Sequence, residues 1–315
     1  MPVRVGVIGA GRWGENHVRI YSDIPCELVG IADIDPKAKR LADDFGIRYF
    51  REFKQLLPHV DAVSVVVPTN LHYRVVKECL ESGKHVLIEK PITLESGQAS
   101  ELIAIARRKG LVLMVGYLFR FNACVRELKR QLENIGDINY ITARYVHSHK
   151  PPRSDCGVIF NFATHLIDIL NFLLDRNPQR VFCKKINYLS KEREDCAVIV
   201  LDYGSFMANL EVTWFHPLKK RDMWIIGSEE KVYADFLEQI LVRYPIRIGK
   251  EKVVSEKEIN LEIHKNEPLR EELLSFCQRA ESGQADGSEG EETITRICEL
   301  CLESAKTGRE VKVRP

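Results

Sequence analysis

Short apolar runs alternate with longer amphipathic stretches over the first 120 residues of the chain. The stretches are about ten to fifteen residues long and carry apolar positions at helical spacing. The apolar runs are VRVGVIG, ELVGIAD, DAVSVVV, HVLIE and LVLMVG. Strands that alternate with helices in this way form a parallel sheet with helices on both faces. The pattern therefore predicts an α/β domain over residues 1–120.

After Phe121 the strands follow one another without helices between them. Helices are expected at about 122–132 and 159–174, on either side of the long alternating strand INYITARYVHS. The later runs are CAVIVLDYG, FMANLEVTWF, RDMWIIGS, KVYADF and ILVRYPIRIG, and two helices at about 268–281 and 292–305 follow them. Residues 121–315 are therefore predicted to form an α+β domain with an open, mostly antiparallel sheet that helices cover on one face.

The composition narrows the class of partner. Hydrophobic residues make up 45% of the 315 residues, and 46 Lys and Arg nearly balance 45 Asp and Glu. Such a chain has no global basic field for nucleic acid, so a small molecule is the expected partner. No apolar run reaches the ~18 residues that a membrane span needs, and Val3–Ile8 is too short for a signal peptide. We therefore expect no membrane association and a cytoplasmic protein.

The nine cysteines predict neither disulfides nor a metal site. Their number is odd and they are scattered through apolar segments, whereas a disulfide framework needs pairs in a small chain. Cys298 and Cys301 form a C-x-x-C, but they recur at the spacing of an apolar helix face and no second ligand pair lies nearby. The histidines show no H-x-x-x-H or H-E-x-x-H spacing. Buried, reduced thiols and no metal are expected.

A glycine pattern near the N-terminus points to a dinucleotide. Gly9, Gly11 and Gly14 fit G-x-G-x-x-G directly after the first apolar strand and at the start of a helix. In such a turn the first glycine permits the tight bend, the second lets the backbone approach a pyrophosphate, and the third allows close packing of helix and strand. The N–H groups of the helix N-terminus attract the phosphates. Residues 1–120 are therefore expected to form a Rossmann domain.

The acidic residue after the second strand distinguishes the two nicotinamide cofactors. Asp33 ends that strand about twenty residues after the glycine turn, where a carboxylate accepts hydrogen bonds from the adenosine ribose hydroxyls. No arginine follows it directly, and Asp33 with Asp35 would repel the 2′-phosphate of NADP. NAD is therefore expected. Lys37, Lys39 and Arg40 lie in the next helix and keep NADP as the alternative.

Further motifs resemble one enzyme family. They are VPTNLH at Val67–His72, EKP at Glu89–Pro91, HLID at His165–Asp168 and WFHP at Trp214–Pro217. Together with the glycine turn, these motifs resemble the glucose-fructose oxidoreductase / inositol dehydrogenase / MocA (Gfo/Idh/MocA) family over essentially the whole chain. The resemblance implies an NAD(P)-dependent oxidoreductase that acts on CH–OH groups and assembles as a homodimer or homotetramer.

The resemblance also implies catalytic side chains. Lys90 follows a predicted parallel strand, at the sheet edge where α/β proteins bind ligands, and in the family this lysine hydrogen-bonds the reacting hydroxyl. Its peptide bond to Pro91 is often cis there. The second-domain segment NFATHLID resembles D-x-G-x-H-x-x-D, with Asn161 for the first Asp and Ala for the Gly. On one helix face, the amide of Asn161 could orient the imidazole of His165 but could not take a proton.

These residues predict a dehydrogenase. A sugar carbinol would lose hydride to the nicotinamide while His165 takes the hydroxyl proton and Lys90 polarises the oxygen. Which of the two is the base stays open, because a lysine desolvated beside a cofactor can itself be neutral. The expected catalytic residues are Lys90, His165, Asn161 and Asp168. The expected cofactor-binding residues are Gly9, Gly11, Arg12, Trp13, Gly14, Asp33, Pro68, Thr69, Asn70, His72, Glu89 and Lys90.

Two segments resemble the branch of this family that oxidises nucleotide sugars at C3. They are VGYLFRFN at Val115–Asn122 and PPRSDCGV at Pro151–Val158, and an Asn four before the His is also seen in that branch. The branch acts on UDP-N-acetylglucosamine or its uronic acid, so arginines that meet phosphates and rings that stack on a sugar or base are expected. The expected substrate-binding residues are Lys90, Tyr117, Arg120, Arg153, Asn161, His165 and Trp214.

Three alternatives stay open on the sequence. A free-sugar or inositol dehydrogenase would share the fold and the catalytic residues. A non-catalytic, NAD-binding regulator would share the cofactor site, although intact Lys90 and His165 argue against it. A redox-neutral glycosidase that keeps NAD through turnover also fits the fold.

Overall fold

The computed structural model describes residues 2–147, 155–249, 252–284 and 290–313, and the chain divides into two compact units. The first comprises Met1–Leu118 with Leu269–Thr295, and the second comprises Phe119–Pro268 with Arg296–Pro315. The chain passes from the first unit to the second between Leu118 and Phe119, and the later segment Leu269–Thr295 belongs to the first unit. Its helix α8 (Pro268–Ser282) is joined to that unit by an ion pair between Arg270 and Asp23. The spacing of apolar residues in the sequence predicts that this segment is a helix, but it does not indicate which unit the helix packs on.

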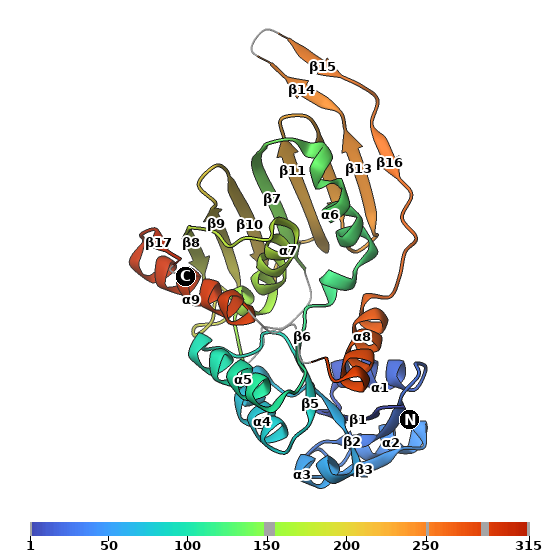
Figure 1. Cartoon of the computed structure of the whole chain (residues 1–315). Coiled ribbons are helices and arrows are strands. Elements are labelled where there is room, and N and C mark those ends of the chain that lie inside the picture. The colour runs from blue at the N-terminus through green and yellow to red at the C-terminus, as the bar shows by residue number, and fades with distance from the viewer. Residues whose placement is uncertain (1, 148–154, 250–251, 285–289, 314–315) are drawn as a thin grey trace. The chain divides into compact units, whose positions relative to one another are not determined.

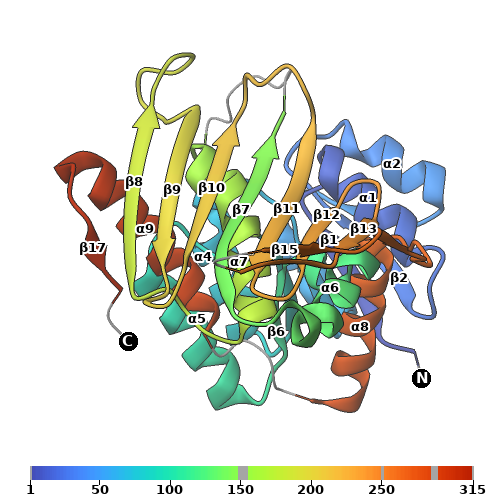
Figure 2. The same ribbon diagram turned by 90° about the horizontal axis from the view of Figure 1, so that it is seen from above.

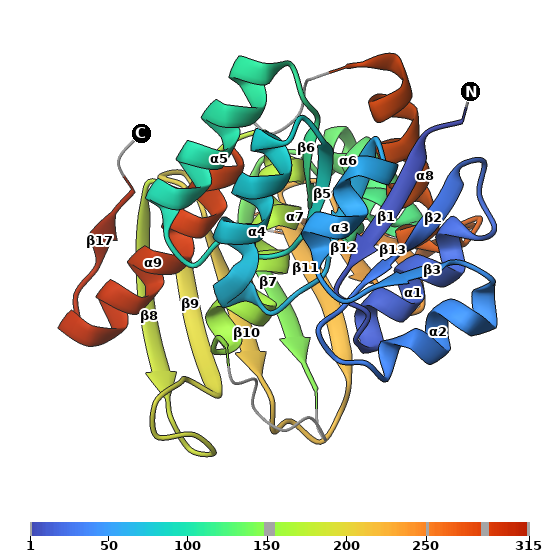
Figure 3. The same cartoon turned by 90° about the horizontal axis from the view of Figure 1, so that it is seen from below.

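The first unit contains a six-stranded parallel sheet in the order β3-β2-β1-β4-β5-β6 (Figures 1 and 3). Its strands are β1 (Arg4–Ile8), β2 (Glu27–Ala32), β3 (Arg48–Phe50), β4 (Ala62–Val65), β5 (His85–Glu89) and β6 (Leu113–Gly116). Its other helices are α1 (Arg12–Tyr21), α2 (Ala38–Phe45), α3 (Phe53–Leu56), α4 (Thr69–Glu81) and α5 (Ser96–Lys109), and a 3-10 turn (Leu57–His59) follows α3. The strand order reverses between β1 and β4, and sheets of this kind bind ligands at the carboxyl ends beside such a switch point. The predicted Rossmann domain is confirmed.

The central strands of this sheet are near-continuous apolar runs because helices cover both of its faces. Every residue of β4 is buried, as are the last four of β1 and of β5. Helices α2 and α5 end at Gly46 and Gly110, whose φ angles of 64° and 63° are left-handed and therefore favour glycine. The carboxyl ends of the strands are thereby fixed on a rigid scaffold.

The second unit contains a nine-stranded sheet in the order β16-β13-β12-β11-β7-β10-β9-β8-β17 (Figure 2). Its strands are β7 (Ile138–Val146), β8 (Arg180–Ile186), β9 (Cys196–Asp202), β10 (Met207–Thr213), β11 (Lys220–Gly227), β12 (Lys231–Asp235), β13 (Ile240–Tyr244), β16 (Ile259–Leu261) and β17 (Val311–Lys312), and β14 (Ile246–Ile248) and β15 (Val253–Ser255) form a separate ribbon. Paired strands run antiparallel except β7 and β10, which are parallel. The expected mostly antiparallel sheet is confirmed.

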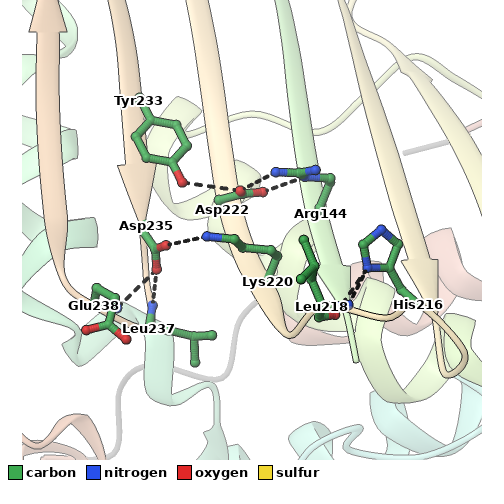
Figure 4. A network of polar contacts seen from close by, with 9 residues as sticks. All are labelled: Arg144, His216, Leu218, Lys220, Asp222, Tyr233, Asp235, Leu237 and Glu238. Atoms are coloured by element: carbon green, nitrogen blue, oxygen red, sulfur yellow. Dashed lines mark hydrogen bonds and ion pairs between the residues drawn. The ribbon is translucent and has the colours of Figure 1, made fainter. Parts of the chain in front are cut away.

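Helices lie on one face of this second sheet (Figure 2). They are α6 (Ala123–Ile135), α7 (Thr164–Leu174) and α9 (Glu291–Thr307), with a 3-10 turn (Leu118–Phe121) before α6 and a π-helical turn (Ile159–Ala163) before α7. Tyr145 of β7 faces these helices, so Arg144, the preceding residue on the strand, faces the open side. On that side Arg144 pairs with Asp222 of β11 at 2.6 Å, and the Tyr233 hydroxyl of β12 donates to Asp222 at 3.3 Å (Figure 4). On the open face, the charge of Arg144 is therefore neutralised by Asp222.

Candidate active site

The turn between β1 and α1 has the geometry that its three glycines predict. Gly9 has a φ angle of 95°, and a Cβ atom on it would lie 2.7 Å from the Val66 carbonyl oxygen. A Cβ on Gly14 would collide with the Gly9 carbonyl oxygen, so only glycine lets α1 approach β1 this closely. Apart from its chain neighbours, no described atom lies within 4 Å of a Cβ built on Gly11. The N-terminus of α1 is therefore open at Gly11, which fits a pyrophosphate.

Asp33, which follows β2, is held beside this turn. Its Oδ2 accepts a hydrogen bond from the Ala10 amide at 2.6 Å, and its Oδ1 accepts one from the Asp35 amide at 2.8 Å. The Tyr49 hydroxyl of β3 donates to the Asp33 carbonyl oxygen at 2.9 Å. A carboxylate oxygen has two lone pairs, so each oxygen of Asp33 can still accept a ribose hydroxyl. This arrangement fits the adenosine half of a dinucleotide.

Glu89 ends β5 and links it to α1. Its Oε1 accepts a hydrogen bond from Trp13 Nε1 at 2.6 Å and lies 3.2 Å from His17 Nε2. The Lys90 amide donates to the other oxygen at 3.2 Å. Burial raises the pKa of Glu89, but the contacts with His17 and Trp13 outweigh burial, so its pKa lies below the usual value. The carboxylate therefore holds the backbone of Lys90 against the first turns of α1.

Lys90 lies at the carboxyl end of β5, and its peptide bond to Pro91 is cis, as the resemblance implies. His72 of α4 joins this segment to the end of β4. Its Nδ1 lies 2.8 Å from the Pro91 carbonyl oxygen, and its Nε2 lies 2.9 Å from the Val67 carbonyl oxygen. The side chain is 1% exposed. His72 was expected to bind the cofactor, but the structure directs both of its ring nitrogens at backbone carbonyls.

The other expected cofactor residues differ in exposure. Arg12 and Trp13 are exposed in the first turn of α1, and Pro68 and Asn70 are exposed where α4 begins. Thr69 lies between the latter two and is buried. Both helix starts follow strands that flank the switch point of the sheet, so their exposed residues line its ligand-binding edge.

His165 lies near the start of α7 in the second unit, and aromatic rings enclose it. Its side chain is 3% exposed, and its ring lies parallel to that of Tyr145, with centroids 5.3 Å apart and 6° between the planes. Phe119 meets the imidazole edge to face at 5.2 Å, and Phe162 stacks on Tyr145 at 4.3 Å. We call Phe119, Tyr145 and Phe162 the aromatic cluster. Because these rings come from three separate elements, tertiary packing fixes the orientation of the imidazole.

The helix expected at 159–174 begins with a π-helical turn, and buried contacts hold this turn in place. Glu194, ahead of β9, accepts the Ile159 amide through Oε1 at 3.1 Å. Its carbonyl oxygen accepts the Val158 amide at 3.0 Å. Gly157 leaves room for the carboxylate, because a Cβ there would collide with it. Asn161 lies within this turn and is 7% exposed, and π-helical turns are frequent at functional sites.

Asp168, one turn after His165, is paired with Arg120. Arg120 Nε donates to Asp168 Oδ1 at 2.7 Å, and Nη2 lies 2.5 Å from the same oxygen. Burial raises the pKa of Asp168 to about 6, although Arg120 opposes this shift. Asp168 Oδ2 has no hydrogen-bond partner among the described residues. Arg120 was expected to meet a substrate phosphate, but in the structure its guanidinium is engaged by Asp168.

Two rings that were expected to stack on substrate are buried. Tyr117 is 0% exposed and Trp214 is 2% exposed, and Trp214 meets the edge of Phe162 at 6.1 Å. A sequence pattern cannot tell a strand-end ring that packs inside from one that faces a ligand, because both occupy the same phase. Arg153, the remaining expected substrate residue, lies outside the described residues.

Sequence reasoning missed one charged residue next to the aromatic cluster. The guanidinium carbon of Arg221 on β11 lies 4.5 Å from the centroid of the Tyr145 ring. A signal was available in the strand RDMWIIGS, where Arg221 shares the phase of the buried Met223 and Ile225. An arginine at an apolar phase of an alternating strand points toward the helix-covered side, where His165 lies.

Other expectations concern metals, membranes and thiols. Within the described ranges, no group of three or more His, Cys, Asp or Glu could hold a metal ion. No helix in the part of the chain that the structure describes is long and apolar enough to cross a membrane. All nine cysteines lie in the described residues and none of them is in a disulfide, and all but Cys26 and Cys196 are buried. Cys298 and Cys301 are both 0% exposed, as expected for positions on the inner face of a helix.

Comparisons with known proteins find relatives over most of the chain. Residues 3–117 match the family model of the Gfo/Idh/MocA oxidoreductases, NAD-binding Rossmann fold, and residues 125–233 match the model of the Gfo/Idh/MocA C-terminal domain. The chain is 30% identical over 243 residues, 77% of each chain, to UDP-N-acetylglucosamine 3-dehydrogenase of Acidithiobacillus ferrooxidans. It is 25% identical over 308 residues, 92% of each chain, to myo-inositol 2-dehydrogenase of Thermotoga maritima. The solved structure of the Acidithiobacillus ferrooxidans enzyme superposes with a TM-score of 0.86 at 25% identity, covering 98% of this chain and 99% of that one.

Proposed function

The chain belongs to the Gfo/Idh/MocA family of oxidoreductases and carries an NAD-binding Rossmann domain, and from this premise we propose that it oxidises a nucleotide sugar. The proposed substrate is UDP-N-acetylglucosamine or a close relative, and the proposed product is the 3-keto sugar. The observation that carries the reaction type is the presence of two proton-handling side chains, Lys90 after β5 and His165 in α7, on a chain of this family. The similarity to UDP-N-acetylglucosamine 3-dehydrogenase supports the substrate class.

The residues of the first unit fit NAD. The open N-terminus of α1 at Gly11 would hold the pyrophosphate through backbone N–H groups. Asp33 would accept the adenosine ribose hydroxyls, and with Asp35 it would repel the extra phosphate of NADP. Bound NAD supplies the hydride acceptor of the reaction.

The protein itself must move one proton. Oxidation of a secondary hydroxyl releases a proton from oxygen, and we propose that His165 takes it while the Lys90 ammonium donates a hydrogen bond to the same oxygen. The aromatic cluster holds the imidazole in one orientation. Asn161 would orient the substrate or the imidazole as a neutral amide. Asp168 would act through Arg120, with which it is paired.

The proposal includes a homo-oligomer in the cytoplasm. The open face of the second sheet supports a second copy, because Trp224 contacts Tyr233 at 4.9 Å and Tyr244 at 5.5 Å on that side, and Tyr140 is 45% exposed. Aromatic side chains that lie half-buried or exposed on a sheet face are typical of interfaces. Light scattering that gives the mass of a monomer would contradict this part.

One assay tests cofactor and substrate together. Purified protein is incubated with NAD and UDP-N-acetylglucosamine, with and without an aminotransferase and amino donor that remove the keto product. We expect NADH formation that increases when the product is removed. Oxidation of a free hexose or inositol instead would favour the alternative supported by the similarity to myo-inositol 2-dehydrogenase. No NADH from a broad panel of polyols and nucleotide sugars would favour a non-catalytic regulator, and release of a free sugar with NAD unchanged would favour the glycosidase alternative.

A further inference from the structure

Arg221 shares its two aromatic neighbours with His165. The guanidinium carbon of Arg221 lies 4.5 Å from the ring centroid of Tyr145 and 5.9 Å from that of Phe119. The same two rings contact the imidazole of His165, at 5.3 and 5.2 Å. Both side chains belong to the second unit. A cation is therefore held against the rings that orient the proposed proton acceptor.

Unlike its neighbours on β11, Arg221 has no counter-charge among the residues that the structure describes. Lys220 and Asp222 face the open side of the sheet, where Asp235 lies 3.6 Å from Lys220 and Arg144 pairs with Asp222 (Figure 4). Among the described residues, the Arg221 side chain makes no hydrogen bond and no ion pair, and its Nε is buried. A buried donor without an acceptor is costly, and the cost is removed when a ligand supplies one.

The chemistry of this position selects an anion. When a guanidinium stacks on a ring, only its flat face is in contact. Its N–H groups lie in the plane of the guanidinium and are not used by the stacking. That planar fork matches two oxygens of a phosphate or carboxylate. The carboxylate of Asp168, one turn after His165, contacts Arg120 through Oδ1. An anionic group of a ligand beside His165 would supply the oxygens that this fork matches.

We propose that Arg221 is a specificity-determining residue that binds an anionic group of the substrate, either a phosphate of a nucleotide diphosphate or the carboxylate of a uronic acid. This inference rests on the proposed function, because it places the anion on the molecule that His165 deprotonates. It also deepens that function, since the enzyme then selects charged sugars over neutral ones. Arg120, expected from the sequence to meet a phosphate, is paired with Asp168 in the structure.

The test compares Arg221→Met and Arg221→Lys with a matched control, Arg176→Met. Arg176 also stacks on aromatic rings of the second unit, 4.8 Å from Phe206 and 5.6 Å from Tyr203, but it lies outside the aromatic cluster. We expect Arg221→Met to raise KM for the charged substrate roughly ten- to hundredfold, the worth of a charge-assisted hydrogen bond, with kcat changed far less. Arg221→Lys should bind the charged substrate better than Arg221→Met does, because lysine keeps the positive charge but lacks the paired N–H groups of the guanidinium. Arg176→Met should leave both constants near wild type.

Two substrates distinguish the two anions. If Arg221 binds a phosphate, Arg221→Met raises KM for UDP-N-acetylglucosamine and for its uronic acid equally. It also weakens the binding of UDP alone, which calorimetry measures. If it binds the uronate carboxylate, only the uronic acid is weakened. An equal rise in KM for a free, uncharged sugar and for UDP-N-acetylglucosamine, or a fall in kcat with unchanged KM, would mean that Arg221 only supports the rings and would overturn the inference.

Failure of the proposed function gives a different result. In that case the wild-type protein forms no NADH from either nucleotide sugar, and titrations with UDP and with glucuronate become the readout. Binding by wild type that Arg221→Met abolishes would support the anion site without the reaction. Binding that the variant leaves unchanged, or no binding by wild type, would overturn it. Thermal denaturation of each variant controls for folding.

Discussion

The two units hold their proposed site residues in different ways. In the first unit each residue follows a strand end directly: the glycine turn after β1, Asp33 after β2 and Lys90 after β5. In the second unit His165 depends on rings from elements that are distant in the chain, Phe119 before α6 and Tyr145 on β7. A site made of short segments is readable from its spacing, whereas a site made of packed side chains becomes visible only in the folded structure.

The largest expected effect tests whether both units contribute to the chemistry. Lys90→Met and His165→Ala should each lower kcat by roughly a hundredfold or more, because general acid–base groups contribute at least that much. Steady-state NADH formation measures the change. A matched control is His59→Ala, since His59 also stacks on an aromatic ring, Phe50, at 5.6 Å, but lies in the first unit away from the proposed site. A near-normal rate for either variant would remove that residue from the mechanism.

The next prediction concerns the glycine turn of the first unit, whose residues are neighbours in the sequence. Gly11→Ala places its Cβ in open space at an extended residue with φ of −67°, so Tm should hardly change. The methyl group would meet the pyrophosphate, and we expect KM for NAD to rise by roughly tenfold.

Gly14→Ala is the contrasting variant, because its Cβ would collide with the Gly9 carbonyl oxygen and Tm should fall. Thermal denaturation and NAD titration separate the two outcomes. A Gly11→Ala variant with normal NAD affinity would contradict the assignment of that glycine to the pyrophosphate.

Much of the fold was predictable because its signals are periodic. The parallel sheet of the first unit and the alternating strands of the second follow from the apolar pattern, and the glycine turn identified the dinucleotide domain. The packing of α8 on the first unit, the parallel pairing of β7 with β10 and the π-helical turn were not predictable, because each depends on contacts between distant segments. For the same reason the sequence does not show that Arg120 pairs with Asp168 or that Arg221 stacks on Tyr145.

A smaller effect is expected in the second unit, where rings from distant segments surround His165. Tyr145→Leu removes the ring that lies parallel to His165, and we expect kcat to fall by roughly three- to tenfold, the worth of an aromatic pair. Tyr145→Phe keeps the ring and should stay near wild type. Both variants should bind NAD normally, since Tyr145 belongs to the second unit. If Tyr145→Phe lost as much activity as Tyr145→Leu, the hydroxyl and not the ring would be the important group.

The smallest expected effect is a dependence of stability on pH that arises at Asp168. Burial raises its pKa from 3.8 to about 6, so between these values the folded protein holds a proton that the unfolded chain has released. The contribution of this group to the free energy of unfolding is therefore fully present below about pH 4 and is lost as pH rises through about 6. A shift of this size corresponds to about 3 kcal/mol. For a chain of this length the change in Tm is a few degrees.

Asp168→Asn removes this titration while keeping an oxygen that can accept from Arg120. We expect Tm of wild type minus Tm of the variant to decrease between pH 4 and pH 7, measured by thermal denaturation at fixed ionic strength. In Arg120→Met the opposing cation is absent, so the decrease should move to higher pH. A difference that increases with pH would mean that attraction to Arg120 outweighs burial and that the carboxylate is charged in the folded protein even in acid.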